Sequence, residues 1–373
     1  MIVRATQPYF SAEDIDFITE HFAKILQGES FLSMHRYGEQ FEQAFARKIG
    51  VKYAVACNSG TAALEMICRA LDLRGREVIL PSNTFVATAN AILNAGAEPV
   101  FADCGDDMCL SAESVRSRIT DRTGAVMHVH IGGIVSPAAF VLRAICEERG
   151  IPLIEDAAQA HGSRLAGVSA GAIGRAAGFS FFSTKVMTTG EGGMVTTDDE
   201  ELATHMRSLR EFGKVRDDIY VNVHRTLGYN WRMPEVSALM GLRQLASLDG
   251  FLARRREIAS IYDKEFAGHK AICPVAPFEP ESHNFFKYIV VLPEHDRAWV
   301  HRQLAERGVQ PSGYVYELPL HMQPIFPDTH SLLLPGTQYF CARHLCLPIY
   351  VGMTDDQVHY VARTLRQILE SET

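Results

Sequence analysis

The sequence predicts an α/β protein with a large domain built on a mainly parallel sheet and a smaller C-terminal α+β domain. Through the first two-thirds of the chain, short apolar segments typical of strands alternate with helix-like segments. This alternation is typical of a parallel sheet whose two faces are covered by helices. From Pro234 onward the pattern changes to a long helical stretch followed by mixed strands and helices. We place the boundary at this long helix, giving domains 1–250 and 251–373, because a chain of 373 residues usually forms about two domains.

Each element is predicted from its apolar pattern and from the residues at its ends. The expected strands of the large domain are 53–57, 77–81, 99–103, 124–130 and 151–156. The expected helices between them are 61–71, 85–96 and 140–150. In the smaller domain we expect a strand at 286–293, a helix at 296–308, and a last helix opened by a capping box from Thr354 to Gln357. The long helix that starts at Pro234 is expected to be interrupted at Asp249–Gly250.

Charge and composition favour an enzyme that acts on small molecules. The formal net charge is -8, and the acidic residues are spread along the chain without a block of like charges. Nucleic acid or an anionic membrane would require a basic patch, so neither is expected as the main partner. The eight cysteines form no CxxC pair, and His128, His130 and His161 share no metal-ligand spacing, so no metal is expected. We interpret most of the cysteines as buried thiols and these histidines as hydrogen-bonded structural groups. No signal-peptide-like or membrane-spanning apolar run is found, so a cytoplasmic location is expected.

Three segments at the expected strand ends carry chemistry, and each also has a structural explanation. In "ACNSGTAAL", Gly60 would let a phosphate approach the start of a helix, although Ser59 or Thr61 could simply cap that helix. In "LIEDAAQAHG", Asp156 ends an apolar strand and needs a cationic or donor partner, which could be a protonated pyridine nitrogen or a structural group.

The third segment, "GFSFFSTKVMTTGEGGMVTT", places Lys185 after an apolar run with no carboxylate within five positions. A lysine withdrawn from water has a lowered pKa and can form a Schiff base, although a lysine that reaches solvent is the structural alternative. The order of phosphate site, buried acid and lysine is what pyridoxal 5'-phosphate requires, because its phosphate, ring nitrogen and aldehyde must each be held. The glycines at 190–195 are interpreted as a tight turn into a strand, because no GxGxxG or P-loop spacing is present.

The chain resembles the sugar aminotransferases of the DegT/DnrJ/EryC1/StrS family, which are fold-type I pyridoxal phosphate enzymes. The resemblance covers nearly the whole chain and rests on motifs in the family's order. They are "FEQAFARKIGVKYAVACNSGTAAL", "PSNTFVATANAILNAGAEPVFAD", "IEDAAQAHG", "SFFSTK", "GEGGMVTTDD", "LGYNWRMPEVSALMGLRQL", "LPLHMQP" and "LCLPIY".

The resemblance implies a role for several residues. Lys185 matches the lysine that holds the cofactor covalently, and Asp156 matches the partner of the pyridine nitrogen. Further matches are Gln159 beside the phenolic oxygen, Phe85 on the ring, Gly60, Thr61 and Ser180 at the phosphate, Asn230 reaching the phosphate from the other subunit, and His321 on the substrate side. The family therefore implies a homodimer whose active site is shared across the interface. Phe85 has the alternative role of a core residue.

The activity implied is transfer of an amino group from L-glutamate or L-glutamine to a keto sugar, with the cofactor passing through pyridoxamine 5'-phosphate. The acceptor expected first is a nucleotide-linked keto-deoxysugar, with a keto-cyclitol or glycosidic keto sugar of aminoglycoside-type biosynthesis as an alternative. Relatives that dehydrate deoxysugars carry histidine where this chain has Lys185, which favours transamination. The segments at 28–42 and 128–133 depart from the family pattern and leave the sugar open. A different alternative is a fold-type I lyase or decarboxylase, in which Arg232 or Arg343 would clamp an α-carboxylate.

Overall fold

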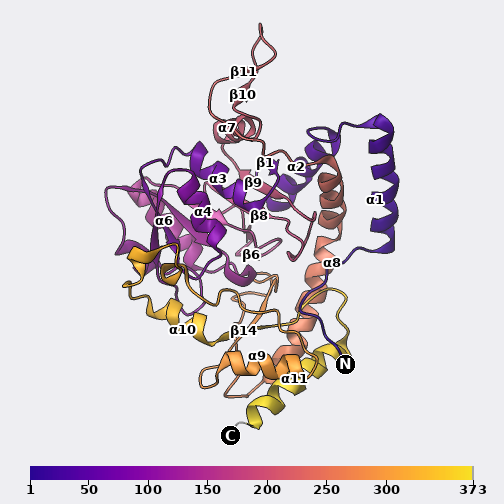
Figure 1. Cartoon of the computed structure of the whole chain (residues 1–373), viewed down its shortest axis with the longest axis vertical. Coiled ribbons are helices and arrows are strands. Elements are labelled where there is room, and N and C mark those ends of the chain that lie inside the picture. Colours follow the sequence, from indigo (N-terminus) through magenta and orange to yellow (C-terminus); the bar gives the residue numbers. More distant parts are fainter. Residues whose placement is uncertain (372–373) are drawn as a thin grey trace.

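The computed structural model describes residues 1–371 and is built around a seven-stranded sheet (Figure 1). The strand order is β1-β9-β8-β5-β4-β2-β3. Strand β9 is antiparallel to both of its neighbours, and the other adjacent pairs are parallel, which confirms the mainly parallel sheet. The strands are β1 Tyr53–Cys57, β2 Glu77–Pro81, β3 Glu98–Ala102, β4 Thr123–Val129, β5 Leu153–Asp156, β8 Ala176–Ser180 and β9 Gly193–Thr197.

Helices cover both faces of this sheet, as the apolar strands require. Successive side chains of a strand point to opposite faces, and those of β1 divide accordingly between two cores. Ala54 and Ala56 pack with helices α2, α6 and α8, whereas Val55 and Cys57 pack with α3, α4 and α7. These helices are α2 Arg36–Ile49, α3 Gly60–Ala70, α4 Val86–Asn94, α6 Ala138–Arg149, α7 Glu200–Arg210 and α8 Glu235–Phe266. The strands and helices expected for this domain are present, with ends that differ by no more than two residues.

The expected interruption of the long helix at Asp249–Gly250 is wrong, because α8 is continuous. A glycine inside a helix costs about 1 kcal/mol relative to alanine, which is the reason the break was expected. Here Leu248, Phe251 and Leu252 on either side are buried. Their burial is worth more than the cost of the glycine, so tertiary packing overrides the local preference.

The C-terminal part of α8 leads into a second, smaller core. Strands β12 Cys273–Pro274, β13 Tyr288–Val291 and β14 His344–Leu347 form an antiparallel sheet. Tyr262 of α8 packs against this sheet together with helices α9 Arg297–Glu306 and α11 Asp355–Glu370. The capping box that opens α11 is present as expected, with Thr354 as its N-cap.

Several shorter elements connect or extend these two parts. They are α1 Ala12–Lys24, η1 Ile25–Glu29, α5 Ala112–Arg116, η2 Ile131–Gly133, β6 Arg164–Leu165, β7 Val168–Ser169, β10 Lys214–Val215, β11 Val223–His224, η3 Leu320–Met322, η4 Pro327–Thr329 and α10 Pro335–Arg343. The β10–β11 hairpin projects from the body of the molecule (Figure 1). Over residues 1–371, none of the helices combines the length and the apolar character needed to cross a bilayer.

Candidate active site

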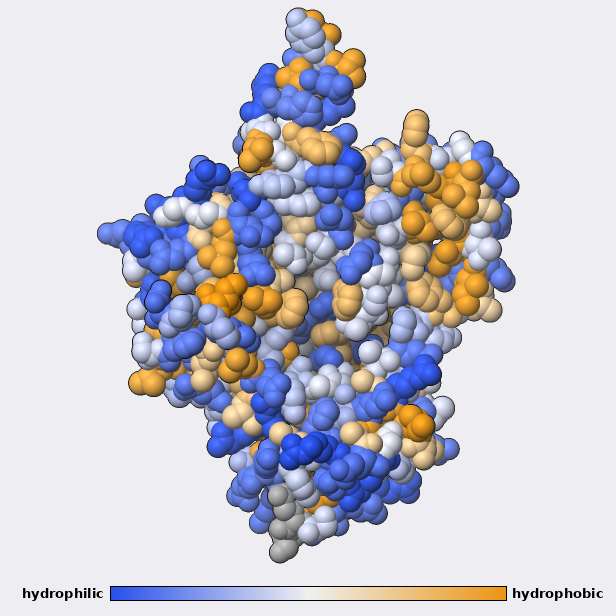
Figure 2. Space-filling model, in the orientation of Figure 1, coloured by the Kyte–Doolittle hydropathy of each residue, from blue (hydrophilic) through white to orange (hydrophobic). Residues whose placement is uncertain are grey.

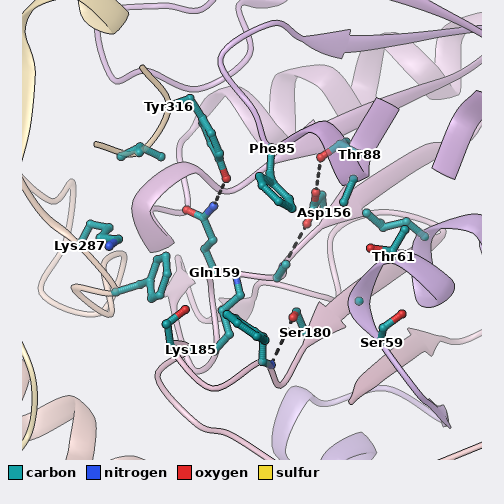
Figure 3. Close-up of a pocket in the computed structure, with 18 of the residues that line it drawn as sticks. Ser59, Thr61, Phe85, Thr88, Asp156, Gln159, Ser180, Lys185, Lys287 and Tyr316 are labelled. Atoms are coloured by element: carbon teal, nitrogen blue, oxygen red, sulfur yellow. Dashed lines mark hydrogen bonds between the residues drawn. The ribbon is translucent and has the colours of Figure 1, made fainter. Parts of the chain in front are cut away.

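A cavity of about 440 Å³ opens where the large domain meets the C-terminal part of the chain (Figure 3). Its size is that of an ordinary cofactor or substrate pocket. It lies beyond the carboxyl ends of β5 and β8, where parallel sheets place their ligand sites. Seven of the residues predicted from the sequence line it: Gly60, Thr61, Phe85, Asp156, Gln159, Ser180 and Lys185.

One wall of the cavity is the beginning of α3. Ser59 caps this helix by accepting a hydrogen bond from the amide of Ala62 at 3.1 Å, so the capping role is confirmed. The amides of Gly60 and Thr61 come first in the helix and have no acceptor within it, which makes this end suitable for an anion. A Cβ on Gly60 would lie 2.6 Å from the Cβ of Ser180. Only glycine therefore allows the helix to start this close to the end of β8.

Asp156 ends strand β5 and is only 6% exposed. Its carboxylate accepts hydrogen bonds from the Thr88 hydroxyl at 2.8 Å and from the Ala158 amide at 3.2 Å. Burial raises the pKa of Asp156, while these two hydrogen bonds and the charge of Lys185 act in the opposite direction. A carboxylate in this environment favours a positively charged or protonated partner in the cavity.

Lys185 lies on the turn after β8, which ends at Ser180, so it follows the strand by a few residues. Its ammonium lies 4.9 Å from the centre of the Phe286 ring. The pKa of Lys185 is lowered to about 8, mainly because burial disfavours the charged form. The Asp156 carboxylate opposes this shift and the Lys287 charge adds to it. About a tenth of the lysine is therefore a free amine at pH 7, as a nucleophile or base requires.

Two aromatic rings and an amide form the upper wall in Figure 3. Phe85 is the N-cap residue of α4 and is 58% exposed, so it is not the core residue considered as an alternative. Its ring lies roughly parallel to that of Tyr316, with centroids 6.3 Å apart. Gln159 donates from Nε2 to the Tyr316 hydroxyl at 2.6 Å and accepts from the Gly132 amide at 2.7 Å. Because the Gly132 amide can only donate, the side-chain oxygen of Gln159 must face it, and the side-chain nitrogen must face Tyr316.

Sequence reasoning missed several other residues that line the cavity, among them Thr88, Glu191, Phe286, Lys287 and Tyr316. Thr88 could have been found, because it lies one helical turn after Phe85 and so shares its face of α4. Lys287 and Tyr316 are more than a hundred residues from Asp156 in sequence, and no local pattern marks them.

Two predicted residues are not brought into this cavity. Asn230 is exposed and forms an antiparallel bridge with Glu211 at the end of α7, and its backbone carbonyl accepts a hydrogen bond from the Asn58 side chain at 3.5 Å. His321 is buried, and its Nδ1 lies 2.7 Å from the Ser82 hydroxyl. Arg232 and Arg343, the alternative carboxylate clamps, also lie outside the lining. Arg232 stacks over Phe212, and Arg343 bonds the carbonyl of Pro293 and stacks over Tyr339.

The histidines predicted to be structural behave differently from one another. His130 is buried and bonded through Nε2 to the Glu155 carboxylate at 2.8 Å, as expected for a structural group. His161 and His128 are also buried, but the ring nitrogens of both have no hydrogen-bond partner within residues 1–371, so the expectation is wrong for these two residues. His128 in addition lies edge-on to the His130 ring. Burial and the adjacent His130 lower its pKa well below the usual value and keep the ring neutral, which limits the cost of the missing partner.

The residues of the cavity fit pyridoxal 5'-phosphate. The α3 start and Ser180 form a cradle that tolerates only glycine at position 60. Asp156 is a buried carboxylate without an ion-pair partner among the described residues, and Lys185 is an amine with a lowered pKa in the same cavity. Phe85 presents an exposed apolar ring between them. An anionic group, a ring nitrogen and an aldehyde on one flat molecule match these three features.

Comparison with known proteins agrees with this geometry. The sequence matches the model of the DegT/DnrJ/EryC1/StrS aminotransferase family over residues 13–366. It is 36% identical to GDP-perosamine synthase of Caulobacter vibrioides over 344 residues, which cover 90% of this chain and 91% of that protein. It is 34% identical to dTDP-4-dehydro-2,3,6-trideoxy-D-glucose 4-aminotransferase of Saccharopolyspora spinosa, with coverage of 99% and 97%. The solved structure of NtdA from Bacillus subtilis, with bound cofactor PMP, superposes with a TM-score of 0.88 at 26% identity, covering 99% of this chain and 86% of that one. This chain belongs to the DegT/DnrJ/EryC1/StrS aminotransferase family.

Proposed function

We propose that this protein is a pyridoxal 5'-phosphate-dependent aminotransferase that moves an amino group from L-glutamate or L-glutamine to a nucleotide-linked keto sugar, giving an amino sugar. The observation that carries the proposal is the shared cavity of Lys185 and Asp156. An amine with a pKa near 8 and a buried carboxylate occupy one pocket, each in the environment its role requires. The named relatives that act on GDP- and dTDP-linked sugars support the choice of acceptor.

Each residue has a separate task toward the cofactor. The amides of Gly60 and Thr61, with the Ser180 hydroxyl, would bind its phosphate, and Phe85 would pack on its ring. Asp156 would hold a proton on the ring nitrogen, and Gln159 would bind the phenolic oxygen. When bound, the cofactor supplies an electron sink for the carbon that exchanges its amino group.

Lys185 would act as both base and acid. Its Nζ would accept the proton from the α-carbon of the amino donor and would donate a proton to the carbon that carries the aldehyde of the cofactor. A pKa near 8 suits this exchange, because the amine and ammonium forms are both populated near neutral pH. With the keto sugar, Lys185 would carry out the same proton transfers in reverse order.

The lining of the cavity argues against the lyase and decarboxylase alternative. Such enzymes commonly hold the α-carboxylate of an amino acid with a bidentate arginine. Within residues 1–371 no arginine lines the cavity, and Arg232 and Arg343 are engaged elsewhere.

We infer further that the active enzyme is a homodimer in which Asn230 reaches the cofactor phosphate of the other subunit. Large apolar side chains on the projecting hairpin and beside α1 support an interface. Figure 2 shows apolar surface at the hairpin tip and over the α1 side, and the exposed residues there include Ile219, Val221, Leu26, Phe31 and Leu32. Scattered exposed apolar residues are normal, but groups of this kind mark contact surfaces.

Absorption spectroscopy tests the reaction directly. The purified protein with added pyridoxal 5'-phosphate should turn yellow, and the colour should bleach with L-glutamate or L-glutamine. Keto sugars can then be screened for their ability to restore the colour. Binding of the cofactor without bleaching by either donor would reject transamination with these donors and favour the lyase.

Complementation tests the shared site. Lys185→Ala and Asn230→Ala homodimers should each have little activity. After mixing and subunit exchange, a heterodimer has one site with both residues intact, so activity should reappear. A size tag on one variant shows whether heterodimers have formed. If they have formed and activity is still absent, the active site is not shared between subunits.

A further inference from the structure

The cavity contains a second lysine, Lys287, directly before strand β13. Its ammonium lies 5.2 Å from the centre of the Phe286 ring, the same ring that the Lys185 ammonium contacts at 4.9 Å. Lys287 donates hydrogen bonds to the carbonyl of Ser312 at 2.8 Å and to its hydroxyl at 2.6 Å. Residues of the C-terminal part of the chain thus hold a second cationic group next to the reactive amine.

The Lys287 ammonium has no counter-ion among residues 1–371. An ammonium has three N–H donors, and Ser312 accepts two of them, which leaves one for a ligand. No aspartate or glutamate among the described residues forms an ion pair with it, and burial lowers its pKa. Lys287 is half-buried, and a charge partly removed from water without a partner is costly, so this position is suited to an anion that arrives with a substrate.

The position of Lys287 separates it from the proposed cofactor phosphate site. Figure 3 shows Lys287 at the opposite end of the cavity from Ser59, Thr61 and Ser180, with Gln159 and Lys185 between them. The cofactor phosphate would already be bound at the α3 start. An anion bound at Lys287 would therefore belong to a reactant.

We infer that Lys287, held by Ser312, binds the α-carboxylate of the amino donor. This inference rests on the proposed function. The donor's α-carboxylate is bonded to the carbon whose proton Lys185 exchanges, so its binding group must lie close to Lys185. Lys287 meets this requirement, because one aromatic ring contacts both ammonium groups. The diphosphate of a nucleotide sugar is separated from the reacting carbon by the sugar ring and fits this position less well.

Two variants of Lys287 and one control test the inference. Lys287→Met removes the charge and keeps an unbranched apolar stem, and Lys287→Arg keeps the charge. Lys264→Met is the control, because Lys264 is an exposed lysine of α8 outside the cavity. The dissociation constant of L-glutamate is measured by spectral titration of the cofactor-loaded protein without keto sugar. Binding of glutarate, a carboxylate that cannot react, is measured by calorimetry.

Lys287→Met should weaken binding of L-glutamate and glutarate by about tenfold to a hundredfold, the range for a hydrogen bond to a charged group. The KM of the keto sugar should change by less than about threefold, because only the donor step uses the lysine. Lys287→Arg should recover part of the loss, and Lys264→Met should match the wild type.

Three results would overturn the inference. Donor binding that is unchanged in Lys287→Met would exclude contact with the carboxylate. A selective rise in the KM of the keto sugar would assign Lys287 to the acceptor's phosphates. A fall in kcat with a shifted pH profile and unchanged donor binding would mean that Lys287 acts only on the charge of Lys185. Failure of the wild-type protein to bleach with either donor would instead reject the proposed function, and glutarate binding would still report on Lys287.

Discussion

The side-chain amide of Gln159 donates a hydrogen bond to the hydroxyl of Tyr316 at 2.6 Å, and thereby ties the end of strand β5 to a segment 157 residues later in the chain. Gln159 is almost completely buried, and its side-chain oxygen accepts a hydrogen bond from the Gly132 amide. The hydrogen bond closes one side of the cavity between the two parts of the molecule.

Removing the Tyr316 hydroxyl should therefore destabilise the protein. Tyr316→Phe leaves a buried donor of Gln159 unpaired, which should lower the free energy of unfolding by about 1–3 kcal/mol. Urea denaturation of the cofactor-free protein measures this. Tyr220→Phe on the exposed hairpin is the matched control and should have no effect, since Tyr220 is 66% exposed. Equal stability of the two variants would show that the Gln159–Tyr316 bond contributes nothing.

The close approach of α3 to β8 gives a second prediction. In Gly60→Ala, the new Cβ would collide with Ser180, so the helix start must move and the anion cradle must widen. We expect a loss of about 1–3 kcal/mol in stability and at least about tenfold weaker cofactor binding. Gly250→Ala in α8 is the control, because a Cβ there meets open space and should stabilise the helix by about 0.5–1 kcal/mol. Equal cofactor affinities of the two variants, measured by titration, would show that the start of α3 does not bind the cofactor phosphate.

The carboxylate of Asp156 should be needed in its charged form. Asp156→Asn keeps the shape but removes the charge, and kcat should fall by about a hundredfold or more. Single-turnover bleaching with L-glutamate measures the effect, and circular dichroism checks that the fold is intact. A variant that keeps wild-type turnover would rule out the role proposed for Asp156.

The hydrogen bond from Thr88 should influence the pH at which the Asp156 carboxylate becomes protonated. Burial raises the pKa of Asp156 and this bond lowers it, so Thr88→Val should raise the pKa further. Because the carboxylate is lost as pH falls through its pKa, the acid side of the pH–rate profile should move to higher pH. Thr88→Ser retains the hydroxyl and should leave the profile in place. A profile for Thr88→Val that coincides with the wild type would contradict the effect.

The rate at which the cofactor-free protein takes up cofactor should be proportional to the fraction of Lys185 that is in the free-amine form. With its pKa lowered to about 8, the reactive fraction should fall about tenfold for each pH unit below that value and level off above it. Stopped-flow absorbance between about pH 6 and 10 measures the rate, with Lys185→Ala as the control that should not turn yellow. A midpoint near 10.5, the ordinary value, would show that the lysine is not buried as described.

The parts of the site that the sequence predicted share one physical basis. Asp156, Gln159, Ser180 and Lys185 follow the ends of neighbouring strands, and Phe85 and Gly60 lie at the start of helices. In a parallel sheet these strand ends lie along one edge, and the helices that follow begin there. The local order of strand, short turn and helix indicated Gly60, Asp156 and Lys185, and the family resemblance added Phe85, Gln159 and Ser180.

Other features of the site depend on contacts between segments that are distant in the sequence, and only the tertiary structure shows them. Tyr316 and Lys287 enter the cavity because the antiparallel C-terminal unit packs against the sheet, and their pairing with Gln159 and Ser312 has no signal in sequence spacing. The continuity of α8 through Gly250 likewise depends on the burial of its neighbours, not on local helix preference. The sequence by itself determined the family and the parallel sheet and indicated the residues proposed to bind the cofactor, since these depend on neighbours along the chain. Packing between distant segments determined the closing wall, the second lysine and the lowered pKa of Lys185, since burial exists only when those segments come together.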